Sequence, residues 1–403
     1  MGITLAAMAL IAARDGNDAV KDQVNLKSQV RAQKALSEEK VSGVRVIQAN
    51  NAALGSSAIV VGGGTYPTDE NAAPTPLYVS PVSFLAHASI PIDSAEMVNG
   101  KGDAINLVTQ NMRNASATAA HDMGRAIFDG YLGAVEVTTS ISAGAIASLP
   151  VNQASGLRQN KIVDLYQTNG STKVGTGRVG AVTRDGDGTC HVAVSELKDT
   201  SGATLTGSLA AGTGLWIQGF LTPAAAQQFC SLSSAVGSAD LYGTNVASAD
   251  WTGVDKTLGD VISLGALRGL CDDIASRNGS DPDVFFMGRA VFQDWEQLQA
   301  TNIRYAQGDT LDPLGKNGVR PMFRDKPIVV DDNCPDSQVF AVVKDAYLLG
   351  LKRELSTLGN TGAGGPEVSQ TKLSYLIKIF GMMNGIVDHR NGVGRLKSVT
   401  ITP

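Results

Sequence analysis

The sequence predicts an α+β fold in which a block of short β-strands interrupts a chain of mixed helices and strands. Apolar residues recur at steps of three and four along 103–128, which indicates one long amphipathic helix. Closely spaced strand patterns with turn residues between them fill 135–219, which is typical of a small barrel or sandwich. Helix and strand patterns lie on both sides of this block, so we interpret it as an insertion.

The composition bounds the fold and excludes several kinds of function. The chain has 403 residues, of which 43% are hydrophobic, enough for two or three domains with sizeable cores. A net charge of −5 argues against a broad nucleic-acid-binding surface, which needs a basic field. The apolar run Ile3–Ala13 has no basic residues before it and is about half as long as a membrane span, so neither a signal peptide nor a transmembrane helix is expected.

Cysteine and histidine spacing predicts no metal centre and no nucleophilic site. The chain has four cysteines without a CxxC pair and four histidines spread over its length. No histidine has a Ser or Cys near it in a recognisable nucleophile motif, and reduced thiols in an intracellular protein are the simplest interpretation. These residues are Cys190, Cys230, Cys271, Cys334, His87, His121, His191 and His389.

The first 92 residues predict two segments that lack cores of their own. Residues 1–43 are charged and sparsely apolar, and are either a frayed segment or an arm that orders against a neighbouring chain. Residues 44–92 predict an extended β-hairpin, with two strand patterns on each side of the Gly- and Pro-rich stretch 62–76: Val44–Ala49, Ala58–Val61, Leu77–Val79 and Ser83–Ile92. A hairpin of this kind needs another surface to lie on.

The helix predicted at 103–128 would be about 40 Å long, at about 1.5 Å per residue. Asp103 can cap its first turn, and Gly130 suits a left-handed conformation after its end. On periodicity alone it is an ordinary long core helix. Its apolar stripe comprises Ile105, Val108, Met112, Ala115, Ala119, Met123, Ala126 and Ile127.

Most of the remaining chain is assigned to short strands and three helices. The strands expected in the insertion are Val135–Ile141, Lys161–Gln167, Lys173–Thr183, Thr189–Ser195 and Thr213–Gln218. The helices expected after it are Pro223–Val236, Leu258–Arg277, with Val261 on its buried side, and Gly288–Ala300. The strands expected there are Val284–Met287, Lys326–Asp331, Gln338–Lys344, Ser374–Met382 and Arg395–Ile401.

Two sequence motifs suggest ligand sites, but the structural explanation of each is stronger. Gly175–Gly180 fits G-x-G-x-x-G, yet it lies inside a strand pattern and not between a strand and a helix, so we interpret the match as coincidence. Asp185, Asp187 and Glu196 match three positions of a calcium loop, but Cys190 stands where glycine must make the bend. A plain hairpin turn is the better interpretation.

Carboxylate pairs likewise predict no active site. Asp272–Asp273 lies on a helix face and Asp331–Asp332 at a turn, and we interpret both as solvated. The sequence therefore predicts no catalytic residue, no cofactor-binding residue, no metal ligand and no enzyme activity.

The order of elements, together with Pro282–Phe292 and Phe323–Asp345, resembles the major capsid proteins of tailed bacteriophages, the Hong Kong 97 (HK97) type. The resemblance covers about 44–403 and implies an HK97-like capsid fold. The implied parts are an N-terminal arm 1–43, extended loop 44–92, peripheral domain 93–134 with spine helix 103–128, inserted β-barrel 135–219, axial domain 220–345, and return to the peripheral domain 346–403.

The resemblance implies a structural protein that assembles into hexamers and pentamers of an icosahedral head around double-stranded DNA. The implied location is the virion capsid, assembled in the host bacterial cytoplasm. Implied partners are further copies of the chain, scaffolding, portal or decoration proteins, and weakly bound DNA, with no membrane. Some relatives cross-link a loop lysine, but 46–100 contains no lysine, so this cross-link is not expected. A long charged scaffolding segment is also missing, so a separate scaffolding protein is expected, with the arm 1–43 as the alternative scaffold.

Two other functions stay open at the level of sequence. One is the shell of a cellular cargo compartment, similar to an encapsulin. The other is an enzyme with an accessory β-barrel, which would need a convergent polar pocket that the sequence does not indicate. A carbohydrate-binding role for 135–219 also stays open, with Trp216, its one tryptophan, as either an aromatic platform or a core residue.

Overall fold

A computed structural model gives the structure of the chain. It describes residues 35–41, 45–49, 75–91, 110, 114–115, 117, 119, 121, 123–128, 137–142, 148–151, 157, 159–167, 172–184, 190–206, 208–217, 229–236, 241, 252–302, 322–357, 367–368 and 374–402. Predictions for other residues, among them most of the arm, the loop tip 62–74, Met112 and the turn that contains Asp185 and Asp187, lie outside the described residues.

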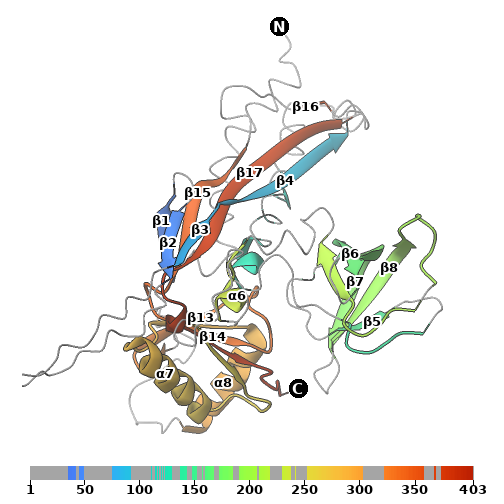
Figure 1. The fold of residues 1–403 in the computed structure, drawn as a ribbon. Coiled ribbons are helices and arrows are strands. Elements are labelled where there is room, and N and C mark those ends of the chain that lie inside the picture. The colour runs from blue at the N-terminus through green and yellow to red at the C-terminus, as the bar shows by residue number, and fades with distance from the viewer. Residues whose placement is uncertain are drawn as a thin grey trace, which may run out of the picture.

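The described strands form four sheets (Figure 1). The first is a five-stranded sheet in which the long antiparallel pair of β4 and β17 is the main feature. Its strands are β1 (Ser37–Lys40), β4 (Val82–Pro91), β15 (Tyr347–Thr357), β16 (Glu367–Val368) and β17 (Ser374–Val387). Apart from β1, which runs parallel to β15, the paired strands are antiparallel. The end of the predicted arm therefore pairs within its own chain, and Leu36 beside it is buried in the same core.

The extended hairpin is formed by β2 (Arg45–Ala49) and β3 (Thr75–Val79), which pair antiparallel from Arg45↔Val79 to Ala49↔Thr75. The strand predicted at Ser83–Ile92 is present as β4. The prediction that it belongs to the hairpin is wrong, because β4 pairs with β17 of the C-terminal region. A strand pattern identifies an extended segment but does not identify its partner.

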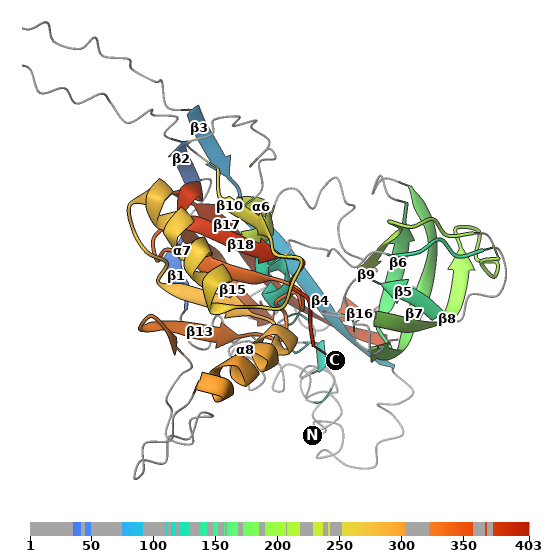
Figure 2. The same ribbon diagram turned by 90° about the horizontal axis from the view of Figure 1, so that it is seen from below.

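The second large sheet has six strands in the order β10-β18-β14-β11-β13-β12 and mixes parallel and antiparallel pairs. Its strands are β10 (Val254–Thr257), β11 (Val284–Met287), β12 (Met322–Phe323), β13 (Lys326–Val330), β14 (Val339–Val342) and β18 (Val393–Lys397). Helices α7 (Leu264–Asn278) and α8 (Arg289–Asn302) cover one face, as seen from below in Figure 2.

Burial on both faces explains the continuous apolar runs in this sheet. In β11, Phe285 and Met287 pack under α7 and α8, while Val284 and Phe286 belong to the core on the opposite face. Strands that are covered on both faces are apolar throughout and do not alternate. The strand predictions at Val284–Met287, Lys326–Asp331 and Gln338–Lys344 are confirmed by β11, β13 and β14.

The start of α7 corrects one sequence prediction. The helix was expected from Leu258, but it begins at Leu264, because the Ser263 hydroxyl accepts a hydrogen bond from Ala266 N at 3.1 Å and caps it. Residues 258–261 instead continue alongside β18, where Leu258 N donates to Lys397 O at 2.9 Å. Val261 is therefore 37% exposed and not on the buried side of a helix. The other end is capped by Gly279, which has a φ of 76°.

The C-terminal strands do not return to one sheet together. Ser374–Met382 lies within β17, as predicted, but the strand predicted at Arg395–Ile401 is β18, which pairs with β10 and β14 in the six-stranded sheet. The short 3₁₀ turn Arg390–Gly392 separates β17 from β18 and lets the chain change sheets. The two strands therefore belong to different sheets.

Every described residue between 110 and 128 is helical, in agreement with the predicted long helix. Ala119, Met123 and Ile127 of the apolar stripe are buried, whereas Asn114 is exposed. The Phe128 ring meets the rings of Phe286 and Phe340, with centroid distances of 5.8 and 5.9 Å. This end of the helix therefore packs against the six-stranded sheet. No described helix is long and apolar enough to cross a membrane.

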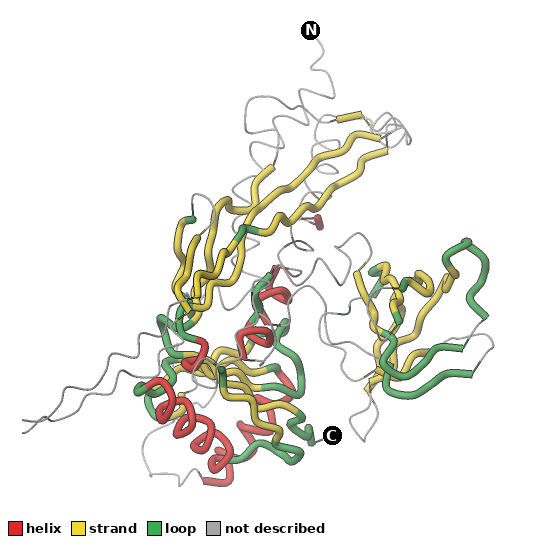
Figure 3. The backbone as a smooth tube through the Cα atoms, in the orientation of Figure 1, coloured by secondary structure: helices red, strands yellow, loops and turns green. Residues whose placement is uncertain are grey.

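The inserted block has a sheet and a core of its own, drawn as the separate group of yellow strands in Figure 3. Its strands are β5 (Ser148–Val151), β6 (Ile162–Tyr166), β7 (Lys173–Arg184), β8 (Cys190–Asp199) and β9 (Gly214–Ile217), in the order β5-β8-β7-β6-β9. Four of these strands were predicted, and β5 was not. The strand predicted at Val135–Ile141 is present in the described residues as isolated bridges at Val137 and Ile141.

A short helix, α6 (Leu232–Val236), lies between the two large sheets and is buried in the core that they share. It falls within the helix predicted at Pro223–Val236, of which 223–228 lie outside the described residues. The two-stranded hairpin, the five-stranded sheet and the α6 segment meet around β17, and their contacts form the best-defined polar site described below.

Candidate functional site

Side chains that could carry catalysis or bind a metal are dispersed in the part of the chain that the structure describes. No group of three or more His, Cys, Asp or Glu residues there is placed to hold a metal ion. His121 is buried on the long helix, His191 lies on β8, His389 is exposed before the 3₁₀ turn, and His87 lies on β4. The four cysteines are buried and form no disulfide, and burial raises the pKa of Cys271 to about 11.

The glycine motif lies within a strand, as its sequence context indicated. Gly175–Gly180 is part of β7, which pairs with β6 and β8 on its two sides. A Cβ atom at Gly177 would lie 2.5 Å from Val194 Cγ1, so this glycine allows close packing inside the inserted block. Asp185 and Asp187 lie outside the described residues, and Glu196 faces Arg178, with 3.5 Å between Oε2 and Nε.

The interpretation of the Asp331–Asp332 pair as solvated is wrong for Asp331. Its side chain is buried, at 1% exposure, and Oδ1 accepts hydrogen bonds from Asn333 N at 2.9 Å and Asn333 Nδ2 at 2.8 Å. Asp332 is exposed and faces Arg289 at 3.0 Å. Asp331 therefore holds the shape of the turn after β13, because a buried carboxylate requires such hydrogen bonds.

The base of the extended hairpin is anchored in the core of the chain. Val79, Val82 and Phe84 are at most 5% exposed, while Tyr78, one residue further into the hairpin, is 60% exposed. Between the anchoring residues, the carbonyl of Ser80 accepts a hydrogen bond from Asn384 Nδ2 at 2.6 Å. The position from which the hairpin leaves the subunit is thus fixed by the five-stranded sheet.

Asn384 joins this hairpin base to the segment that leads into α6. Its Oδ1 accepts a hydrogen bond from Cys230 N at 2.9 Å, and the side chain is 2% exposed. Tyr347 completes the contact, because its hydroxyl donates to Cys230 O at 2.8 Å. Burial raises the pKa of Tyr347 well above its usual value, so the hydroxyl keeps its proton.

Gly385 is required at this contact for steric reasons. A Cβ atom there would overlap the carbonyl oxygen of Cys230 and the hydroxyl of Tyr347. The N–H of Cys230 is bonded to Asn384 and its carbonyl to Tyr347, so the backbone at Cys230 passes directly over β17. We call Asn384, Tyr347, Gly385 and Cys230 the polar joint.

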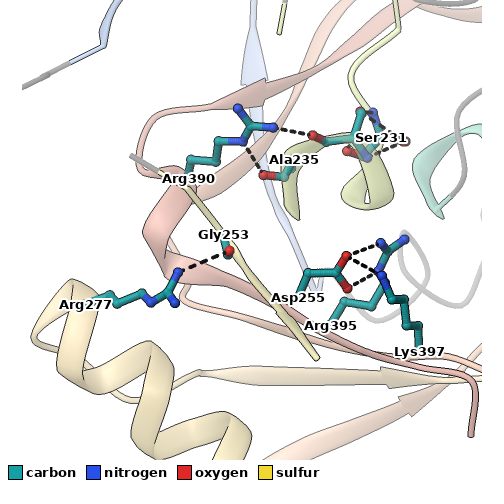
Figure 4. Close-up of polar contacts among 9 residues, drawn as sticks. Ser231, Ala235, Gly253, Asp255, Arg277, Arg390, Arg395 and Lys397 are labelled. Carbon is teal, nitrogen blue, oxygen red and sulfur yellow. Dashed lines mark hydrogen bonds and ion pairs between the residues drawn. The ribbon is translucent and has the colours of Figure 1, made fainter. Parts of the chain in front are cut away.

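Arg390 fixes the other end of the α6 segment (Figure 4). Its side chain is 0% exposed, and Nε donates to Ala235 O at 2.7 Å while Nη2 donates to Ser234 O at 3.1 Å. Carbonyl groups at a helix end have no partner inside the helix and attract a positive charge. Arg390 thus holds the end of α6, just as the polar joint holds its start.

Charged residues stabilise the edge of the six-stranded sheet (Figure 4). Asp255 of β10 accepts hydrogen bonds from Arg395 Nε at 3.1 Å, Arg395 Nη2 at 2.8 Å and Lys397 Nζ at 3.0 Å. Burial acts to raise the pKa of Asp255, but these hydrogen bonds and positive charges outweigh it and hold the pKa below its usual value. Asp283 is held in the same way by Lys326 and Lys344 N.

Sequence reasoning did not identify the residues of the polar joint or Arg390. One signal was available, because Asn384-Gly385 is a turn dipeptide that interrupts an apolar strand pattern. In the structure the strand continues through this dipeptide. The Asn384 amide makes hydrogen bonds, and the absence of a side chain at Gly385 leaves room for the Cys230 carbonyl. These contacts position backbone segments, and among the described residues they do not form a pocket with reactive groups.

Comparison of the sequence with protein-family models and with curated proteins finds no match. Solved structures are similar. The capsid asymmetric unit of cyanophage A-1(L) matches 91% of this chain and 90% of its own, with 10% identity and a TM-score of 0.53. The capsid of an empty GTA particle matches 93% of this chain and 91% of its own, with 10% identity and a TM-score of 0.47. A virus-like particle from Pyrococcus furiosus matches 95% of this chain and 98% of its own, with 7% identity and a TM-score of 0.42. The first match shows the fold: the chain has the HK97-like fold found in phage capsid proteins.

Proposed function

We propose that this chain is a major capsid protein, a structural subunit without enzyme activity that assembles into hexamers and pentamers of an icosahedral phage head. The observation that carries the proposal is the shared fold over 91% of the chain. The hairpin supports it, because its base is anchored in the core while Tyr78 is 60% exposed. A narrow two-stranded hairpin has little core of its own and gains stability by lying on another surface, such as a neighbouring subunit.

The proposal assigns the parts of the chain to the parts of a capsid subunit. We assign 1–43 to the arm, 44–81 to the extended loop, 82–134 to the peripheral domain, because β4 pairs with β17, 220–345 to the axial domain and 346–403 to the return to the peripheral domain. The pairing of β18 with β10 and β14 adds one refinement, since it links the last strand to the axial sheet.

We further propose that 135–219 is a small inserted barrel. Support comes from Val137, which bridges to Val151 at the β5 edge of the sheet. Its N–H also donates to Thr213 O at 2.9 Å, and its carbonyl accepts from Gly212 N at 2.8 Å, next to β9 at the other edge. The segment at Val137 thus links the β5 edge to the β9 edge, and a sheet whose two edges are linked in this way can close into a barrel.

The partners that follow from this function are mainly further copies of the chain. Scaffolding, portal and decoration proteins are proposed as additional partners, and packaged double-stranded DNA as a weak one. The net charge of −5 supports weak and non-specific DNA contact, because tight binding would need a basic surface. The proposed location is the virion, after assembly in the cytoplasm of a bacterial host.

Size-exclusion chromatography and electron microscopy of the expressed full chain test this function. We expect ring-shaped capsomers or closed shells, and their symmetry can be read from class averages. A chain that stays a folded monomer at high concentration, without capsomers or shells, would contradict the proposal. An enclosed enzyme in particles purified from the native source would favour a cargo compartment over a phage head.

A second experiment tests the role of the hairpin. Because β3 begins at Thr75, residues 62–74 can be replaced by a short Gly-Ser linker without removing a described strand. We expect the subunit to fold with an unchanged thermal transition, while the yield of shells falls. An unchanged shell yield would contradict the assignment of this hairpin to intersubunit contact.

A further inference from the structure

Two large apolar side chains are exposed at opposite ends of the six-stranded sheet. Met322 on β12 is 55% exposed, and Val261, four residues after β10, is 37% exposed. The strand order places β10 at one end of the sheet and β12 at the other, and Figure 2 shows β10 and β13 on opposite sides of it. The other apolar residues of this sheet are mostly buried.

Both ends of the sheet are open edges in the part of the chain that the structure describes. There, β12 pairs with β13 alone, and β10 pairs with β18 alone. Val261 extends the β10 edge through a parallel bridge to Thr400. Open edges carry unpaired backbone groups and are the usual places where another chain adds to a sheet.

Opposite charges stand beside the two apolar residues. Arg324 is two residues from Met322; its side chain is 43% exposed and reaches Asp272 of α7 only at 3.5 Å. Asp260 is exposed next to Val261, and its Oδ1 accepts a hydrogen bond from Val261 N at 2.7 Å. An arginine at one edge and an aspartate at the other are complementary if the two edges meet.

The β12 edge is held in a defined shape. Arg324 and Asp325 form the turn between β12 and β13, with φ values of 48° and 63°. Left-handed conformations are uncommon for residues other than glycine and persist where surrounding contacts hold them. Here the ring of Phe323 packs against Trp295 at 5.7 Å and against Phe285 at 5.5 Å, which fixes the strand that carries Met322.

We propose that the β12 edge of one copy docks on the β10 edge of the next copy, so that Met322 covers Val261 and Arg324 faces Asp260. The contact joins two different surfaces of the same chain, head to tail. A head-to-tail contact closes into a ring when the rotation between neighbours divides a full turn, as the five- and six-fold capsomers of the proposed function require. The inference rests on the proposed capsid function and deepens it, since it names the surfaces that meet inside a capsomer.

Cysteine cross-linking tests the contact in assembled particles. The double variant Val261→Cys/Met322→Cys is treated with a short bismaleimide, and background is low because the four native cysteines are buried. We expect a ladder of covalent species that ends at five and six subunits. Particles assembled from an equal mixture of the two single variants should give covalent dimers and no longer species, because each subunit then carries one engineered cysteine and can join to only one neighbour.

Controls separate this contact from other arrangements. Each single variant alone should stay monomeric on a denaturing gel; dimers from Met322→Cys alone would indicate a two-fold contact and overturn the proposal. The pair Ile162→Cys/Met322→Cys, with Ile162 also 37% exposed but in the inserted block, should give no ladder. Normal particles without a ladder in the Val261/Met322 variant overturn the contact but not the capsid function, whereas failure of the wild-type chain to assemble overturns the capsid function itself.

A charge exchange provides a second test that does not depend on cysteines. Arg324→Asp and Asp260→Arg should each lower the rate and yield of assembly, because each places like charges at the junction. The double exchange should restore both. If the double variant assembles no better than the worse single variant, while all three fold normally by circular dichroism, the proposed contact is wrong.

Discussion

Gly124 of the long helix lies directly against the amide of Asn333: a Cβ atom at position 124 would be 2.5 Å from Asn333 Nδ2. Asn333 has little room to move, because it is 1% exposed and bonded to Asp331 through both its backbone and its side-chain nitrogen. The long helix therefore packs at close range against the turn after β13. This contact ties the proposed peripheral helix to the proposed axial sheet.

Gly124→Ala should destabilise the subunit by up to about 2 kcal/mol, since overpacking of this kind typically costs about 1–3 kcal/mol and the gain in helix propensity offsets about 1 kcal/mol. In an Asn333→Ala background the same change should instead stabilise by up to about 1 kcal/mol, because only the propensity gain remains. Urea unfolding of unassembled subunits measures both. Equal effects in the two backgrounds would contradict the contact.

Tyr347→Phe should cost about 1–2 kcal/mol of unfolding free energy, because it leaves the buried carbonyl of Cys230 without its donor. Tyr78→Phe is a matched control: the same hydroxyl is removed from a residue that is 60% exposed, and no change is expected. Thermal or urea unfolding of the two variants side by side gives the comparison. Similar losses would show that the polar joint contributes no specific stability.

Ala119→Lys should abolish folding, because the side chain at 119 is 7% exposed and packs in the main core. Asn114→Lys, on the exposed side of the same helix, should leave a folded subunit and at most affect assembly. Soluble yield and the near-UV circular dichroism spectrum report folding. A folded Ala119→Lys subunit would show that the faces of this helix are assigned incorrectly.

Asp255 should make stability depend on pH in the acid range. Its pKa in the folded chain is below the ordinary value of 3.8, so the ionised form is stabilised by folding. The stabilisation is present above the ordinary pKa and is lost as pH falls through the folded-state pKa. Asp255→Asn should be less stable than the wild type at pH 7, and the difference should shrink below about pH 4.

Urea midpoints measured from pH 7 to pH 3 test this prediction. Asp283→Asn should behave in the same way, because Lys326 and Lys344 N also hold the pKa of Asp283 below its usual value. If the wild type stayed more stable than the Asn variants by the same amount down to pH 3, folding would not lower the pKa of these two carboxyl groups.

The four cysteines should be unreactive in the folded subunit. All are buried, and the pKa of about 11 for Cys271 leaves only about one thiol in a thousand ionised at pH 8. Titration with a chromogenic disulfide should detect no fast reaction in native protein and all four thiols in urea. A rapid native reaction would reveal an accessible cysteine and would require its removal before cross-linking.

Local patterns in the sequence identify most of the helices and strands after residue 220. Val284–Met287 is buried on both faces, and its continuous apolar run is enough to predict a covered strand. The apolar stripe through Ala119 and Met123 predicts which side of the long helix is buried. These predictions succeed because burial imposes a period on a single segment, and that period is visible without knowledge of the partner.

The candidate site could not be predicted in this way. Asn384-Gly385 has the composition of a turn, yet the strand continues, because Cys230, more than 150 residues earlier, occupies the space and the hydrogen bonds that they provide. Asp331 has the composition of a solvated turn but is 1% exposed, and the Asn333 side chain that donates to it packs against Gly124 of the long helix. In both cases the deciding neighbour is distant in sequence.

The order of residues along the chain was sufficient to predict where many segments are helical or extended and which faces they bury. Long-range contacts were needed to establish that β4 pairs with β17, that β18 joins the six-stranded sheet, and that Val261 and Met322 are exposed at its two ends. The physical reason is that secondary structure and amphipathic burial follow from neighbours along the chain, whereas strand partners and open edges follow from contacts between segments far apart in sequence.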